Sequence, residues 1–545
     1  MTEHDPPSAI TDPNAPVPDD DRITPEILKV AGVVVLGAIM SILDVTVVNV
    51  ALPTFQTELS TTGEPLAYST VAWTATAYML ALAAVIPLTG WAADRFGTKR
   101  LYITALTLFT IGSALCAAAW NIESLISFRV LQGLGGGMLM PLGMTIMTRA
   151  AGPHRMGRLM AILGIPMLLG PIMGPILGGV VIDQASWHWV FLINLPIGLA
   201  ALVYAIRVLP RDATEPSERL DVVGMLLMSP GLALFLYGVS TIPETGTVAS
   251  AKVLVPGIAG ALLVAGFVLY SFRPEHPLLN LRLLANRNLA VATIVMFLFA
   301  GAFFGALLLV PTYFQQVRGE SVLMAGLLVA PQGLGAMLTM PIAGTLVDRM
   351  PVGRIVPFGL LGILTGLLGV SLSTAPDTSY WQIVACLFVM GLGMGATMMP
   401  IFTSALKTLK AHDVARGSTL INVVQQVASA TGIATISVVL TNSMKSGAIL
   451  PGSEQVPGLE GGVTAAQLAA TSNTDQGERL IQALQVPADV LQQGLIDLAD
   501  AFQSSYWVAL TVLVVTLVPV SLLPRRREVS RLADDEDGAP PALVH

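Results

Sequence analysis

Long apolar blocks alternate with short polar segments along most of this chain. A block of about 20 apolar residues predicts a helix that crosses a lipid bilayer, because a helix of that length spans the hydrocarbon core. Fourteen such blocks can be distinguished. They lie near residues 28–51, 69–91, 101–120, 123–147, 159–183, 188–208, 222–241, 252–272, 289–311, 321–346, 355–373, 381–404, 418–441 and 506–523. The pattern predicts an all-α polytopic membrane protein with fourteen transmembrane helices.

Composition agrees with this interpretation and excludes several classes of function. Hydrophobic residues make up 54% of the chain and charged residues 12%, whereas a soluble domain carries about 25% charged residues. The mean hydropathy is +0.72. No basic block suggests nucleic acid. Cys116 and Cys386 both fall within predicted spans, so we expect neither a disulfide framework nor a metal site.

The basic residues indicate the orientation of the spans. If both termini are cytoplasmic, 23 of the 28 Lys and Arg residues fall on the inner side, four fall on the outer side, and Arg129 lies within a span. Because cytoplasmic loops are enriched in Lys and Arg, this distribution predicts that both ends of the chain lie inside. The excess of Arg over Lys and the abundant Ala, Gly, Val and Leu indicate a bacterium. We therefore expect a multi-pass protein of its inner (plasma) membrane.

Both tails and one loop extend beyond the spans. Residues 1–27 are rich in Pro and Asp and lack the basic segment of a signal peptide, so they predict a disordered cytoplasmic tail. Residues 524–545 form a second cytoplasmic tail. The one long outer loop is 442–505. An amphipathic helix on the outer membrane surface or over the bundle is one interpretation of its last part, and a spacer is the other. The helical spacing there involves Val490, Leu491, Leu495, Leu498 and Phe502.

The chain contains an internal repeat. The segments GWAADRFGTKR (90–100) and GTLVDRMPVGR (344–354) both fit G-x-x-x-D-R-x-x-x-x-R, at an offset of 254 residues. GLGGG (133–137) and GLGMG (391–395) align at an offset of 258. The repeat pairs a six-helix bundle at 28–208 with another at 289–523 and leaves 222–272 as two inserted helices. Parallel halves of this kind predict an alternating-access transporter with its substrate site between them.

One pair of charges breaks the repeat. Asp44 and Arg129 lie inside predicted spans at similar depth, while the equivalent positions hold Ala302 and Leu387. Burial disfavours an ionised carboxylate and a nearby arginine favours it, so Asp44 could take up a proton on one side of the membrane and release it on the other. We interpret the pair as the proton-coupling site. The alternative is an interhelical hydrogen bond that only orients the first span.

With these segments in view, the chain resembles the major facilitator superfamily, and within it the fourteen-span drug:proton antiporters of the EmrB/QacA type. The resemblance covers nearly all of residues 28–523. LDVTVVNVALP (43–53) and RVLQGLGGG (129–137) are similar to the signatures of the first and fourth spans. The resemblance implies a role in proton translocation for Arg129.

Two further motifs carry the resemblance. The G-x-x-x-D-R loops are similar to the cytoplasmic gates of the family, which implies gate roles for Gly90, Asp94, Arg95, Gly97 and Arg100 and for Gly344, Asp348 and Arg349. The second loop departs from the pattern, with Pro351 in place of Gly97, so its gate is expected to be weaker or stiffer. GPIMGPILGG resembles the antiporter motif of the fifth span through Gly170, Gly174, Pro175, Gly178 and Gly179.

The expected substrate cavity lies between the halves. Methionines there suit varied apolar ligands, although core packing is the alternative interpretation for most of them. Three polar residues of the thirteenth span share one helical face and offer hydrogen bonds without charge. The predicted cavity residues are Gln132, Met138, Met398, Asn422, Gln425 and Gln426.

These observations predict a proton-coupled multidrug efflux antiporter for hydrophobic or amphipathic compounds. The alternative is an exporter or flippase of a lipid or lipid-like metabolite. No phosphate-binding loop occurs, so a proton gradient is the expected energy source and no cofactor is expected. No catalytic cluster is apparent, which disfavours an enzyme or sensor. The expected partners are a small substrate and membrane lipid, without nucleic acid. A monomer is expected, and an accessory periplasmic protein stays an open alternative.

Overall fold

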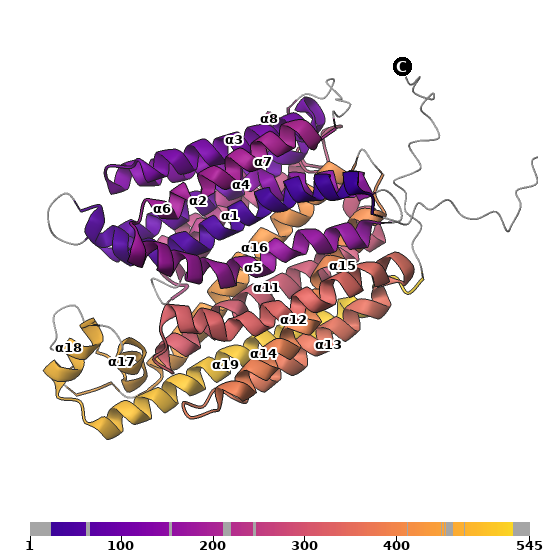
Figure 1. Cartoon of the computed structure of the whole chain (residues 1–545). Helices are drawn as coiled ribbons and strands as arrows, with labels where there is room; N and C mark the ends of the chain where they lie inside the picture. The colour runs from indigo at the N-terminus through magenta and orange to yellow at the C-terminus, as the bar shows by residue number, and fades with distance from the viewer. Residues whose placement is uncertain are drawn as a thin grey trace, which may run out of the picture.

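The computed structural model describes residues 23–60, 66–151, 155–210, 220–242, 247–410, 413–447, 449–451, 453, 462–472 and 475–526. Its helices run nearly parallel to one long axis (Figure 1). Most of both predicted tails lies outside the described residues. The first helix begins at Pro25, before the predicted start of the first span at residue 28.

The elements follow one another as helices of very different length. They are α1 Pro25–Glu58, α2 Tyr68–Phe96, α3 Thr98–Ala117, α4 Ile122–Ala151, α5 Met156–Gln184, α6 Trp189–Leu192, α7 Asn194–Val208, α8 Val222–Ser240, α10 Ala251–Tyr270, η1 Leu281–Ala285, α11 Arg287–Gln316, α12 Val322–Arg349, α13 Val352–Ser371, α14 Tyr380–Gly395, α15 Met398–Lys407, α16 Val414–Lys445, α17 Ala465–Thr471, α18 Asp475–Leu484 and α19 Ala488–Ser521.

Thirteen helical segments of the described residues are long and apolar enough to cross a membrane. The pair α6–α7 counts as one of them, as does the pair α14–α15. Within α5, the described apolar stretch Met156–Pro166 is too short to be counted. The all-helical membrane architecture predicted from sequence is therefore confirmed, whereas the count of fourteen is not established.

Local sequence signals set the ends of several helices. Thr24 caps α1 by accepting a hydrogen bond from the backbone N–H of Ile27, and Pro25 occupies the first turn, where its missing N–H costs nothing. Between α2 and α3 the chain turns at Gly97, whose φ of 87° is a conformation that favours glycine. At the equivalent place in the repeat, Pro351 is extended and leads directly into α13.

Helix contacts form two sets, separated in Figure 1 by colour. In the first set, α1 packs on α4, α5 and α7, while α2 and α3 pack on α4. In the second, α11 packs on α16 and α19, while α12 and α13 pack on α14. The two sets meet where α5 contacts α12 and α15, and where α16 contacts α2 and α4.

Glycines make equivalent close contacts in the two sets. A Cβ atom at Gly133 would lie 2.6 Å from the backbone oxygen of Tyr78, and one at Gly391 would overlap the backbone oxygen of Gln332. Gly135 and Gly393 approach α3 and α13 in the same way, at Ala105 and Gly359. In both halves, glycines stand at equivalent positions of the fourth helix of the repeat. Because glycine has no side chain, this helix packs closely against its neighbours.

The helices α8 and α10 form a hairpin beside both sets. They pack on each other through Gly231, Gly238 and Gly260. The hairpin contacts α2 and α16, and Tyr237 of α8 stacks on Trp73 of α2 with ring centroids 5.4 Å apart. This hairpin therefore covers the line where α2 and α16 meet.

The long outer loop contains α17 and α18, which lie beside the first turns of α19 (Figure 1). Its last part is helical, as the spacing from Val490 to Phe502 predicts. It does not form a separate surface helix, because α19 runs without interruption from Ala488 to Ser521 and packs on α17. The buried residues Leu498 and Phe502 face the bundle, which makes this segment an extension of the last span.

Close packing of α11 on α16 gives a stability prediction. A Cβ atom at Gly432 would overlap the backbone oxygen of Gly301. We expect Gly432→Ala to destabilise the protein by about 1–3 kcal/mol, because a backbone contact cannot move aside as a flexible side chain can. The measurement is the midpoint of thermal unfolding in detergent.

The matched control is Gly257→Ala in α10, where a Cβ atom would meet nothing within 4 Å. It should unfold at or above the temperature of the unmodified protein, because alanine is the better helix former. Equal melting of both variants would contradict the role assigned to the Gly432 contact.

Candidate functional site

Asp44 and Arg129 form an ion pair in the interior of the first set of helices. Arg129 Nη1 lies 2.5 Å from Asp44 Oδ2, and the side chains are 1% and 0% exposed. Charged groups are costly in an apolar interior unless they are paired and fully hydrogen-bonded. Asp44 and Arg129, which the sequence places at similar depth, are therefore in direct contact between α1 and α4.

Neutral donors complete the environment of the carboxylate. Gln132 Nε2 donates to Asp44 Oδ1 at 2.7 Å, and Asn194 Nδ2 donates to the same oxygen at 3.1 Å. Both donors are buried. Asp44 is thus held by one cationic and two neutral side chains, which come from α4 and from the first residue of α7.

The guanidinium has a second set of partners. Arg129 Nη1 also donates to Gln132 Oε1 at 2.7 Å, and Arg129 Nε donates to the backbone oxygen of Thr74 at 3.1 Å. The centroid of the Tyr78 ring lies 4.1 Å from the guanidinium carbon of Arg129. These contacts would keep Arg129 in place when its bond to the carboxylate is broken, since none of them is a direct bond between Arg129 and Asp44.

The local fold explains how these groups meet. Arg129 and Gln132 are three residues apart on α4 and therefore share one face of the helix. Asn194 follows the short helix α6, and its side chain also donates to Ser113 Oγ at 3.1 Å. Ser113 in turn donates to the backbone oxygen of Phe191 at 2.9 Å. The interruption between α6 and α7 thus places an amide beside α1.

The structure assigns Gln132 a different position from the one predicted. Expected in the substrate cavity, it is 0% exposed and joins Asp44 to Arg129. The spacing from Arg129 could have indicated this. Asn194, Thr74 and Tyr78 were missed, because nothing in the sequence distinguishes neutral residues of this network from those of other spans.

The equivalent place in the second set of helices is uncharged. Ala302 and Leu387 occupy the positions of Asp44 and Arg129, and both are buried. Gln332 corresponds to Tyr78 in the repeat, and neither atom of its buried amide has a hydrogen-bond partner in the described part of the chain. The two halves therefore share helix packing but differ in the chemistry at their centres.

The first gate loop connects the two sets of helices. Arg416 Nε of α16 lies 3.2 Å from Asp94 Oδ2 of α2, with both side chains largely buried. Gly90, one turn earlier, allows α2 to approach Arg416 and Ala415 of α16 closely. At this end of the molecule, which the sequence predicts to be cytoplasmic, an ion pair joins the two halves.

The second gate loop makes the reciprocal connection. Asp348 of α12 accepts a hydrogen bond from the backbone N–H of Gly157 at 2.9 Å and from Arg158 Nε at 3.3 Å. Gly157 lies in the first turn of α5, where unpaired N–H groups and the helix dipole favour a carboxylate. Gly344 packs on the backbone of Gly157 and on the small side chain of Ala161, so α5 and α12 approach each other closely.

Other predicted gate residues lie at the edges of these contacts. Arg100 and Arg349 are exposed and Arg95 is half-buried. Gly97 provides the turn between α2 and α3. The two acidic residues and the small residues beside them thus make the contacts between halves, while these arginines lie outside them.

The antiporter motif packs α5 on the helix that carries Asp44. Cβ atoms at Gly170 and Gly174 would overlap Ile42 and Thr46 of α1. Gly178 lies against Val50 in the same row, whereas Gly179 faces open space. The side chain of Pro175 lies outside the described part of α5. Three of the predicted glycines therefore set the distance between α5 and α1.

The remaining cavity residues are mostly buried in this conformation. Met138 and Met398 belong to the apolar core, as the alternative interpretation of the methionines predicts. Asn422 Nδ2 lies 3.2 Å from Met144 Sδ and donates to the backbone oxygen of Ser418. Gln425 is buried and Gln426 is half-buried on α16.

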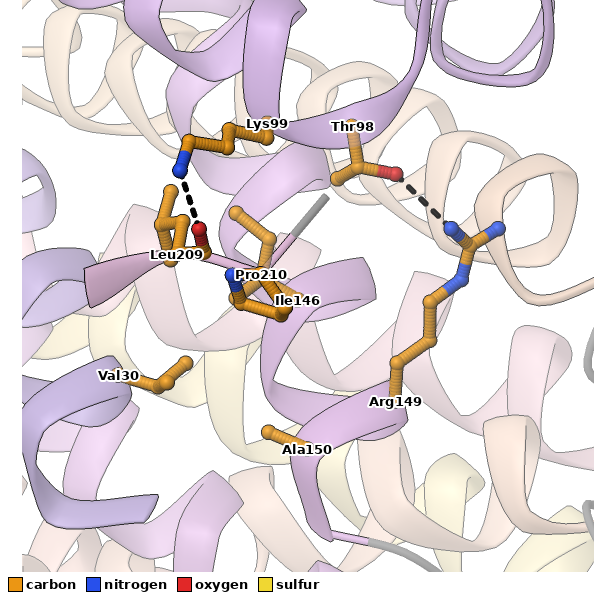
Figure 2. A pocket seen from close by; sticks show the side chains of 8 residues that line it. All are labelled: Val30, Thr98, Lys99, Ile146, Arg149, Ala150, Leu209 and Pro210. Atoms are coloured by element: carbon orange, nitrogen blue, oxygen red, sulfur yellow. Dashed lines mark hydrogen bonds between the residues drawn. The ribbon is translucent and has the colours of Figure 1, made fainter. Parts of the chain in front are cut away.

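A separate pocket of about 130 Å³ lies at the end of the first gate loop (Figure 2). It is formed where α3 begins, α4 ends and the chain leaves α7. Its lining residues are Val30, Thr98, Lys99, Ile146, Arg149, Ala150, Leu209 and Pro210. It is not the predicted substrate cavity. No cluster of His, Cys, Asp or Glu among the described residues could hold a metal ion.

The gate contacts predict how the closed end opens. We expect Asp94→Asn with Asp348→Asn to shift the population toward an open cytoplasmic end by roughly five- to thirtyfold, because each change removes a charge-assisted bond between the halves. The measurement is the distance distribution between spin labels at the exposed residues Arg207 and Lys410. Asp377→Asn, in an exposed position at the other end, is the control, and an unchanged distribution in the double variant would refute the gate assignment.

Comparison with known proteins gives the family. A sequence model described as "Major Facilitator Superfamily" matches residues 34–433. The "Multidrug resistance protein B homolog" of Mycobacterium tuberculosis (strain H37Rv) is 46% identical over 518 residues, which cover 94% of this chain and 93% of that protein. The "Multidrug export protein EmrB" of Escherichia coli (strain K12) is 28% identical over 408 residues, covering 75% and 79%.

Solved structures agree on the fold. The proton:xylose symporter XylE, bound to 6-bromo-6-deoxy-D-glucose, superposes with a TM-score of 0.57 at 14% identity and covers 94% of this chain and 98% of its own. The human organic anion transporter MFSD10 (TETRAN) superposes with a TM-score of 0.55 at 16% identity. The match covers 90% of this chain and 100% of that protein. With its many apolar spans, the protein is a multi-pass plasma-membrane protein. The chain belongs to the major facilitator superfamily.

Proposed function

We propose that this protein is a proton-coupled antiporter that exports hydrophobic or amphipathic compounds by alternating access. The observation that carries the proposal is the buried Asp44–Arg129 pair, present in one half of the molecule and replaced by Ala302 and Leu387 in the other. The names of the relatives, a multidrug resistance protein and a multidrug export protein, support the substrate class.

Protonation of Asp44 would break the strongest contact in the network. The neutral acid no longer attracts the guanidinium, while Gln132 and the backbone oxygen of Thr74 continue to hold Arg129. A charge change at a buried pair is worth several kcal/mol, enough to bias helices that pack in two alternative ways. Proton binding would therefore favour a different position of α1 relative to α4.

A continuous path of packed groups leads from Asp44 to the gates. On α1, Ile42 and Thr46 lie on either side of Asp44 and contact Gly170 and Gly174 of α5. The first turn of α5 holds Asp348 of the other half through Gly157. Movement of α1 can thus be transmitted along α5 to the closed end, because this helix takes part in both contacts.

Among the described residues, the polar side chains predicted to line the substrate cavity are uncharged. We propose that Gln425 and Gln426, with Asn422 after rearrangement, offer hydrogen bonds between the halves, and that Met138 and Met398 offer adaptable apolar surface. The alternative substrate is a lipid or lipid-like metabolite, which the same apolar surface would accept. Transport assays with dyes and with labelled lipids separate these alternatives.

Superfamily members are generally transporters and not enzymes, and we propose no enzymatic activity for this chain. The proton gradient would supply the energy without a cofactor. We propose small-molecule substrates and a monomeric transport unit.

Replacing Asp44 tests the coupling. We expect Asp44→Asn to bind dye with unchanged affinity while losing at least about 100-fold in proton-driven transport, because the amide keeps the shape but cannot release a proton. The measurement is substrate-induced proton movement in proteoliposomes that contain equal amounts of folded protein.

The control is Asp377→Asn, which removes an exposed carboxylate at the outer end. Full coupling in Asp44→Asn would show that the proton takes another route and that Asp44 is structural. If the unmodified protein did not bind the dye, the proposed substrate class would be refuted.

Replacing Gln132 distinguishes the predicted cavity role from the observed network. We expect Gln132→Leu to slow proton-coupled transport about tenfold with KM for the dye within twofold, because the carboxylate and the guanidinium both lose a buried partner. The measurement is the initial rate of dye transport at several dye concentrations. A large rise in KM at an unchanged maximal rate would place Gln132 in the substrate site after all.

A further inference from the structure

Every hydrogen bond that the described residues make to the side chain of Asp44 comes from a donor. Arg129 Nη1 donates to Oδ2, while Gln132 Nε2 and Asn194 Nδ2 donate to Oδ1. An ionised carboxylate only accepts hydrogen bonds, so this set of partners suits the charged form. A protonated carboxyl has an O–H group, which needs an acceptor, and none of the three groups offers one in this arrangement.

Two of the three donors are fixed as donors by their other bonds. A guanidinium has no acceptor atom, so Arg129 cannot accept from a protonated acid. Gln132 has an amide oxygen, but this atom already accepts from Arg129 Nη1 at 2.7 Å and from Cys116 Sγ at 3.5 Å. Those bonds use both lone pairs of the oxygen, and turning the amide would bring its N–H groups against the guanidinium.

Asn194 can change from donor to acceptor. Among the described residues, both hydrogen bonds of its side chain are made by Nδ2, to Asp44 Oδ1 and to Ser113 Oγ at 3.1 Å. Ser113 Oγ in turn donates to the backbone oxygen of Phe191 at 2.9 Å. A hydroxyl can donate or accept, so Ser113 could instead donate to the amide oxygen of Asn194 after a half-turn of that amide.

The other titratable groups near the pair are engaged elsewhere. Tyr78 of α2 has its hydroxyl 3.3 Å from Ser41 Oγ, and the thiol of Cys116 on α3 meets Gln132. Within the described part of the chain, neither group forms a hydrogen bond with Asp44. The amide of Asn194 is therefore the nearest neutral group that already contacts the carboxyl and is able to turn.

We propose that Asn194 is a positioning residue of the proton cycle, whose amide donates to the ionised Asp44 and turns to present Oδ1 as an acceptor once Asp44 is protonated. This rests on the proposed role of Asp44 as the proton carrier. One proton adds to Asp44 Oδ1 and gives the neutral acid, whose O–H donates to Asn194 Oδ1. Ser113 turns its own hydrogen to the same amide oxygen, and neither Asn194 nor Ser113 gains or loses a proton.

The exchange of bonds would reach the interruption between α6 and α7. Asn194 is the first residue of α7, and Phe191 lies in α6. When Ser113 turns to the amide, it releases the backbone oxygen of Phe191. Protonation on α1 thus changes hydrogen bonds on both sides of the interruption, and the state of one carboxyl is passed to a third and a fourth helix.

The test is infrared difference spectroscopy of the full-length protein in proteoliposomes, between neutral and acidic buffer. The band of a protonated carboxyl that disappears in Asp44→Asn belongs to Asp44. We expect this band to move to higher frequency in Asn194→Leu, which keeps the size of the side chain but offers no acceptor. Proton-driven dye transport should fall about tenfold, with dye affinity within twofold, because the buried O–H loses its partner.

Two variants serve as controls. Asn194→Gln keeps an amide and should restore transport to within about threefold of the unmodified protein. Asn121→Ala removes another asparagine of the same half, which accepts from the backbone N–H of Ser124 at 2.9 Å. It should leave both the band and the transport rate unchanged within about twofold.

A second measurement decides the question if Asn194→Leu does not fold. With ¹⁵N in the side-chain amides of asparagine, a label-sensitive amide band should change when Asp44 is protonated. That change should be absent from Asn194→Gln, which keeps the amide but not the label.

Three results would overturn the proposal. An unmoved carboxyl band in Asn194→Leu, or no label-sensitive change in the unmodified protein, would show that the O–H finds another acceptor, such as a backbone oxygen of α1. An equal loss of transport in Asn121→Ala would assign the effect to destabilisation. A carboxyl band that survives unchanged in Asp44→Asn would refute Asp44 as the proton carrier, and with it the proposed function as well.

Discussion

The ion pair between Asp44 and Arg129 lies where water is excluded, and an unpaired charge there would destabilise the fold by about 3–5 kcal/mol. Several features of the first half serve to avoid this cost. Gln132 shares the α4 face of Arg129, and the interruption between α6 and α7 brings Asn194 to the carboxylate. The arrangement of α1, α2, α4 and α7 is thus constrained by the need to satisfy one buried pair.

The second half shows the same helix packing without that constraint. Gly391 and Gly393 make the contacts that Gly133 and Gly135 make in the first half. Where the pair would stand, apolar side chains fill the space. The buried charge pair thus belongs to one half, and the two halves are joined by the contacts of Asp94 and Asp348. The two gates differ as well: both contain an ion pair between the halves, but only Asp348 of the second also accepts a hydrogen bond from a backbone N–H in the first turn of a helix.

The sequence could predict the spans, the repeat and the buried pair, because each depends on residue type and spacing alone. The spacing of three residues from Arg129 could indicate that Gln132 shares its helix face, but not that Gln132 bonds to Asp44, because that depends on the rotation of α4 against α1. Nor did the sequence separate Asn194 from other amides, since its position follows from the interruption before α7. The break between α14 and α15 and the uninterrupted course of α19 were also missed, because tertiary packing decides whether an apolar segment stays straight.

If Asp44 carries the proton, as proposed, the number of such groups limits the energy available to transport. Three carboxylates are buried among the described residues, and Asp221 and Asp348 lie at helix ends, which leaves Asp44 alone at depth. A single exchanging group carries one elementary charge per cycle, worth about 2.3 kcal/mol for each 100 mV of membrane potential. Export of a neutral compound against entry of one proton is electrogenic, and 100 mV supports about a 50-fold concentration ratio. Exchange of a monovalent cation for a proton moves no net charge, so only the pH difference would drive it.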